Sequence, residues 1–410
     1  MVKRKKKYHF YYDEAFHDRK LTENKKIKGE LNIENDEQAD NFISVAIGFK
    51  EHQVDHYLKN YLAFEERTKS LLGIQFEKEF KGTTIKKKNF KYGIHSFNKD
   101  AITIYTDFFD IIDMNFIIQI SIMNKFELLI NSILKDVQLY EMANRENFMY
   151  SIIKFMNQYK NKRLISLLFD DTATSRQAID VIFSLLDEVL NHIKDVPRKT
   201  EEVRAIKEIK TILKNSRLTI QTNQKYHWDY SRSIEGISLL LDELNIKQKS
   251  VLLFIDNEKE TVAAAQKLNF NKVKGVESED FVGVRIADIL SNFIGRIIKA
   301  IEDEHLEDWD KEETKVSISQ LRILSKEWFV LTESQFNLYK KVANVFIDRK
   351  DIYWTIQTGN YAGNASVFLS LIYYIGLSFE TYNDYKKIDL EFHREKFNQE
   401  SVNRESSIFY

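Results

Sequence analysis

Three aspartates stand where a carboxylate could hold a cation. Asp13 follows the aromatic run at residues 8–12, and Asp256 follows the apolar run at residues 251–255. A carboxylate at the end of a buried strand is desolvated on one side, and hard cations bind oxygen ligands. Asp288 lies midway along an apolar helical pattern, where an acid is costly unless it is paired or bound to metal. These types and positions predict an acidic, cation-binding site.

Each aspartate also has a purely structural interpretation. An acid after a strand is commonly a turn or N-cap residue, and Asp288 could form a salt bridge with the nearby Arg285. The run Asp107, Asp110 and Asp113 has helical spacing and is interpreted as a solvated helix face.

A second group of residues combines positive charge with aromatic rings. It follows Lys81 and consists of Lys86, Lys87, Lys88, Phe90, Lys91 and Tyr92. Basic residues interleaved with aromatics suit a nucleic-acid backbone with splayed bases. An ordinary solvated loop in a lysine-rich protein has the same composition, so both interpretations stay open.

Composition limits the chemistry. The 410 residues suggest two or three units, and 12 glycines with one proline, Pro197, favour long helices. Without cysteine there is no disulfide, thiolate metal site or cysteine nucleophile, so a metal must be held by oxygen or imidazole. The formal net charge of -1 gives no global attraction to a polyanion. Because neither a signal-peptide core nor a membrane-spanning run is evident, we expect a soluble, cytoplasmic protein without a membrane partner.

The elements that must position these residues alternate between strand and helix. Apolar and β-branched runs predict strands at 8–12, 41–49, 77–85, 116–123, 251–255 and 272–276. Helical spacing predicts helices from residue 54 to about 72 and at 100–113, 234–244, 262–268 and 281–301. The segment from 126 to about 213 is predicted to be wholly helical, as is the chain from about 316 to 385. This alternation indicates an α/β class.

The same rhythm predicts the domain organisation. Residues 1–125 and 230–300 form one discontinuous α/β core with a mixed sheet, and residues 126–229 form a helical insertion. Residues 301–410 form a C-terminal helical region. The helical additions could bind a protein partner or a second copy of the chain.

These residues carry a resemblance to a known family. The chain resembles the prokaryotic "domain of unknown function 3800" family, whose members have an RNase H-like fold. Four features match in order: the strand ending at Asp13-Glu14, the acid-x-lysine segment Glu79-Phe80-Lys81, the strand ending at Asp256, and the segment from Ser278 to Leu290. The family commonly has Ser-Gly after the first two acids, where this chain has Ala15-Phe16.

The resemblance implies an RNase H-like mixed-sheet core and a site around one or two Mg²⁺ or Mn²⁺ ions. Asp13 would be the bridging ligand and Asp288 the ligand from the late helix. Asp256 or Glu79 would complete the ligand set. Lys81 would neutralise charge at the phosphate, and Glu14 and Glu258 would orient ligands or waters.

Three functions follow from these expectations. The first is a metal-dependent nuclease that hydrolyses phosphodiester bonds in RNA or DNA, by analogy in antiviral defence against phage. The second is a catalytically degenerate RNase H-like protein that binds or senses its ligand. The third is a metal-dependent phosphodiesterase that acts on a small nucleotide. Metal binding separates the second from the others, and the size of the substrate separates the first from the third.

Overall fold

The computed structural model describes most of the chain. The described residues are 7–15, 21–32, 41–134, 137–140, 144–170, 172–196, 199–218, 230–309, 323–347, 349–356 and 359–409. Phe16, Pro197 and the last residues of the expected insertion, 219–229, lie outside the described residues.

A six-stranded mixed sheet forms the centre of the molecule, with strand order β8-β7-β1-β2-β4-β9. β1 is parallel to β7, β7 to β8 and β4 to β9, and β2 is antiparallel to both of its neighbours. All but β2 therefore point the same way. The strands of this sheet are β1 Tyr8–Ala15, β2 Asn41–Lys50, β4 Ile117–Asn124, β7 Val251–Asp256, β8 Lys272–Val276 and β9 Ile352–Ile356.

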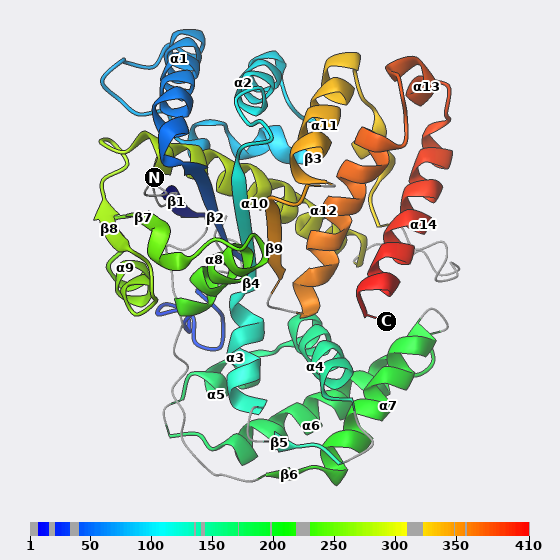
Figure 1. Ribbon diagram of the computed structural model, residues 1–410. Helices are drawn as coiled ribbons and strands as arrows, with labels where there is room; N and C mark the ends of the chain where they lie inside the picture. The colour runs from blue at the N-terminus through cyan, green and yellow to red at the C-terminus, as the bar shows by residue number, and fades with distance from the viewer. Residues whose placement is uncertain are drawn as a thin grey trace.

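Helices cover both faces of the sheet (Figure 1). One face packs against α1 Val54–Leu72, α2 Lys99–Phe109, α10 Val282–Trp309, α11 Glu333–Phe346 and α12 Gly359–Leu377, which share the largest hydrophobic core. The other face packs against α8 Ser231–Glu243 and α9 Lys259–Gln266. Because side chains alternate along a strand, β1 contributes Tyr11 to the first core and Tyr12 to the second.

A separate group of helices extends from the end of β4 (Figure 1). It comprises α3 Lys125–Leu134, α4 Arg145–Tyr159, α5 Lys162–Leu168, α6 Ser175–Ile193 and α7 Thr200–Asn215. These helices have a hydrophobic core of their own. A short pair of strands, β5 Val137–Gln138 and β6 Arg217–Leu218, interrupts the segment that we expected to be wholly helical.

The remaining elements are a short strand near the basic segment and two C-terminal helices. They are β3 Lys91–Ile94, α13 Tyr382–Lys386 and α14 Leu390–Phe409. No helix of the described residues is both long and apolar enough to cross a membrane.

The α/β class with a mixed sheet is confirmed, and the runs at 8–12 and 251–255 are neighbouring parallel strands. Two predictions of secondary structure are wrong. Residues 77–85 form turns and the short 3-10 helix Gly82–Thr84 rather than a strand. The expected helical stretch 316–385 contains β9, which pairs with β4 at the edge of the central sheet. The boundaries of the three units stay a prediction.

Candidate functional site

Asp13 and Asp256 lie on adjacent parallel strands at the carboxyl edge of the sheet. The register pairs Tyr12 of β1 with Ile255 of β7, so the two aspartates are the next residues of each strand. Two residues earlier, Tyr11 and Phe254 stack with ring centroids 5.1 Å apart on the face that α10 covers. Alternation places both aspartates on that face.

The late helix α10 brings Asp288 to the same edge. Its N-terminal part can approach β1 closely because it carries Gly283, where an added Cβ would lie 2.3 Å from the Tyr11 ring. Asp288 Oδ2 accepts a hydrogen bond from the Gly82 backbone N–H at 2.7 Å, and Oδ1 accepts one from Asn292 Nδ2 at 2.7 Å. Asp288 therefore anchors the loop that contains Gly82 to the helix.

The three aspartates influence one another electrostatically. Burial raises the pKa of Asp13 well above its ordinary value, and the charges of Asp288 and Asp256 raise it further. The Glu14 backbone N–H, which donates to Asp13 Oδ1 at 2.7 Å, lowers this pKa. Burial is also the main cause that raises the pKa values of Asp288 and Asp256. Crowded carboxylates with raised pKa values are stabilised by a proton or by a cation.

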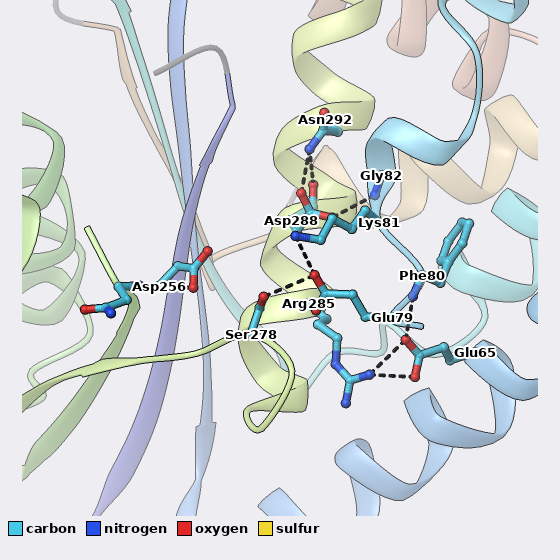
Figure 2. A network of polar contacts seen from close by, with 11 residues as sticks. Glu65, Glu79, Phe80, Lys81, Gly82, Asp256, Ser278, Arg285, Asp288 and Asn292 are labelled. Carbon is cyan, nitrogen blue, oxygen red and sulfur yellow. Dashed lines mark hydrogen bonds and ion pairs between the residues drawn. The ribbon is translucent and has the colours of Figure 1, made fainter. Parts of the chain in front are cut away.

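Lys81 is the lysine whose charge reaches this group. It lowers the pKa values of Asp256 and Asp288, opposing the effect of burial. Its Nζ lies 2.5 Å from Glu79 Oε1, which also accepts a hydrogen bond from Ser278 Oγ at 3.3 Å. Figure 2 shows this chain of contacts from Ser278 through Glu79 to Lys81, beside Asp288. Glu79 thus holds Lys81, and Lys81 faces the aspartates.

A buried ion pair supports the same loop and was not predicted. Glu65 of α1 accepts from Arg285 Nη1 at 2.9 and 2.7 Å and from the Phe80 backbone N–H at 2.9 Å (Figure 2). Lys69 Nζ lies 3.5 Å from Glu65 Oε2. The interpretation that Arg285 pairs with Asp288 is therefore wrong, because its partner is Glu65. The sequence signal for this pair is a glutamate on the buried stripe of a helix, between Tyr61 and Lys69.

These contacts explain why residues 77–85 do not form a strand. The backbone N–H of Phe80 donates to Glu65 and that of Gly82 donates to Asp288. Side chains of α1 and α10 therefore satisfy donors that a strand would direct to a neighbouring strand. An added Cβ at Gly82 would lie 2.6 Å from Asn292 Cβ, so this loop is pressed against α10.

The structure separates Glu14 from the three aspartates. As the residue after Asp13, Glu14 points to the opposite face of the sheet, where its Oε1 accepts from Thr261 Oγ1 at 2.7 Å. Its predicted role in orienting ligands of Asp13 is wrong for this reason. Glu258 remains near the site, because its backbone N–H donates to the Asp256 carbonyl oxygen at 2.5 Å and its charge raises the Asp256 pKa.

The basic segment after Lys81 is exposed in its lysines but not in its rings. Lys86, Lys87 and Lys88 are exposed. Phe90 is only 1% exposed and packs against Phe293 of α10, so its predicted stacking with a base is wrong. Tyr92 is half-buried with Lys91 Nζ 5.0 Å from its ring centroid. The segment can offer positive charge to a phosphate backbone, with Tyr92 as the accessible ring.

The donor set at the sheet edge bears on whether a metal fits there. Within the described ranges, no three or more histidine, aspartate or glutamate side chains are grouped so that they could hold an ion. Mg²⁺ needs fewer protein ligands than this, because it keeps several waters and is commonly bound by one or two carboxylates plus substrate phosphates. Asp13 and Asp288, which offer only oxygen donors and repel each other, fit that smaller requirement.

Comparison of the chain with protein-family models, curated proteins and solved structures found no match. The resemblance to the prokaryotic family therefore rests on the four sequence features alone.

Proposed function

We propose that the chain is a divalent-metal-dependent nuclease with an RNase H-like core, in which Asp13 and Asp288 together hold Mg²⁺ or Mn²⁺. The observation that carries this proposal is the electrostatic coupling of two buried aspartates from distant parts of the chain. Asp288 is the largest charge that raises the Asp13 pKa. A first-strand aspartate, a neighbouring-strand aspartate and a late-helix aspartate are also the arrangement that the family resemblance implies.

The roles of the residues follow from their surroundings. A bound divalent ion supplies an activated water and positive charge for the phosphate. Asp256 adds negative charge at the same edge, and Lys81, whose side chain is 56% exposed, can reach a phosphate in solvent. Glu79 holds the Lys81 ammonium, so it orients that charge rather than serving as a ligand. The exposed lysines at 86–88 favour a polymeric substrate over a small nucleotide, because they add phosphate contacts along a backbone.

One observation favours a second candidate, a degenerate protein that binds nucleic acid without cleaving it. Both carboxylate oxygens of Asp288 already accept hydrogen bonds, from Gly82 and Asn292. In that case Asp288 would act as a structural anchor for the loop, and metal would not be required.

Cleavage assays separate the two candidates. We expect the protein to cleave single- or double-stranded RNA or DNA with Mg²⁺ or Mn²⁺, and Asp13→Asn and Asp288→Asn each to reduce the rate by more than about a hundredfold. Changes outside the ligand set already cost about 10–100-fold in metal enzymes. Asp242→Asn, at an exposed position of α8, is the matched control and should cleave normally. Nucleic-acid binding without cleavage under any of these conditions would reject the nuclease and support the second candidate.

A further inference from the structure

A cavity of about 390 Å³ lies beside the ion pair of Glu65 and Arg285. Its wall is formed by α1, by the turn after α1, by Glu79 and by the start of α10. A volume of this size is within the range of small-molecule sites. It lies behind Glu79, whose Oε1 contacts Lys81.

The lining of this cavity has an excess of negative charge. Five glutamates line it, against one lysine and one arginine. Both basic residues already contact the buried Glu65 carboxylate. Glu66, Glu77 and Glu279 are exposed at the rim. A small cation is therefore favoured here over an anion.

Two buried polar atoms of the lining lack a partner within the described part of the chain. Glu79 Oε2 is a buried acceptor without a hydrogen bond, and the Glu79 side chain is only 9% exposed. Arg285 Nε is a buried donor without a hydrogen bond, and Arg285 is 8% exposed. Figure 2 shows Glu79 and Arg285 gathered around Glu65 from different segments. A buried, unsatisfied group is costly, so each of these atoms favours a ligand that completes its hydrogen bond.

The mouth of the cavity adds an apolar contact. Phe76 is 67% exposed and Leu62 is 41% exposed, and both line the cavity. An aliphatic chain that covers them removes apolar surface from water.

We propose that this cavity binds a small organic ammonium that also carries an oxygen acceptor and a short aliphatic chain. The ammonium would donate to Glu79 Oε2, the oxygen would accept from Arg285 Nε, and the chain would contact Phe76 and Leu62. This site is separate from the edge where Asp13 lies, and the proposal does not depend on nuclease activity.

Three five-carbon probes test the assignment by ligand-observed NMR titration of the whole protein. The amino alcohol should bind, the diol of the same length should bind at least about tenfold more weakly, and the amine without the hydroxyl should lie between them. The tenfold step corresponds to the loss of one charge-assisted hydrogen bond. Binding of the diol as tight as that of the amino alcohol would overturn the assignment of a cation, and absence of amino-alcohol binding would overturn the site.

Two variants locate the binding. Glu79→Gln keeps the shape of the side chain and should weaken the amino alcohol by at least about tenfold. Phe76→Ser changes an exposed residue without entering the core, and should weaken the amino alcohol but preserve its preference over the diol. Glu243→Gln, on the opposite side of the sheet, is the charge-matched control and should bind normally. Unchanged binding in both Glu79→Gln and Phe76→Ser would place the probe elsewhere and reject the proposal.

Discussion

Replacement of Glu65 by methionine tests the buried network that fixes the loop beside the aspartates. Glu65 is 3% exposed and contacts three donors: Arg285 Nη1, Lys69 Nζ and the Phe80 backbone N–H. Methionine has a similar length but accepts a hydrogen bond from none of these donors. The change therefore removes the negative charge and leaves the positive charges in place.

The magnitude follows from what remains buried. Arg285 is 8% exposed and would be left without its carboxylate partner, and removal of one member of a buried ion pair costs about 3–5 kcal/mol. Lys69 is less affected, because its Nζ also donates to the Phe76 carbonyl oxygen at 3.2 Å. We therefore expect Glu65→Met to lower the free energy of unfolding by about 3–5 kcal/mol.

A double-mutant cycle separates the ion pair from the change in packing. Replacement of both Glu65 and Arg285 by methionine leaves no unpaired charge between them, so the double variant should be at least about 2 kcal/mol more stable than the sum of the single changes predicts. The measurement is urea unfolding followed by circular dichroism. Glu66→Ala, at the exposed neighbouring position, should change stability by less than about 0.5 kcal/mol.

Hydrogen exchange reports on the same network locally. The Phe80 amide donates to Glu65, so it should exchange faster in Glu65→Met even under conditions where the whole protein stays folded. A decrease in stability below about 1 kcal/mol, additive single changes, or a Phe80 amide that stays protected would refute the reasoning.

Three further predictions concern the site and its supports. The raised pKa of Asp13 means that the unfolded chain releases this proton at lower pH than the folded protein does, so stability falls as pH rises above the ordinary aspartate range, by about 1.4 kcal/mol per unit of pKa elevation. Metal-free Asp13→Asn should therefore be more stable than the parent at neutral pH but not below about pH 4, as measured by thermal unfolding; equal stabilities at both pH values would exclude the coupling. Changing lysines 86–88 to glutamine should flatten the slope of log binding constant against log salt by about 0.9 for every phosphate on duplex DNA that these lysines neutralise, and the same change at the exposed lysines 247, 249 and 259 should not. Gly283→Ala should cost about 1–3 kcal/mol in urea unfolding, since its Cβ would meet the Tyr11 ring; a neutral effect would mean that α10 can move away from β1.

The sequence by itself determined the strands that carry Asp13 and Asp256. Each is a short apolar run that ends in an acid, and this pattern depends only on local burial. It also determined the long helix that carries Asp288, whose apolar stripe fixes the helical period. The parallel pairing of the two strands then brings the first two aspartates together.

Only the tertiary structure decided the loop that faces these aspartates. Residues 77–85 have the composition of a strand, but Glu65 and Asp288 bind their backbone donors from two different helices. Phe90 is surrounded by lysines in the sequence and yet lies in the core, because its burial depends on α10. β9 is five residues long, and its stability as a strand comes from pairing with β4, more than two hundred residues earlier. Contacts between distant segments leave no local periodicity, so the pattern of neighbouring residues could not have supplied them.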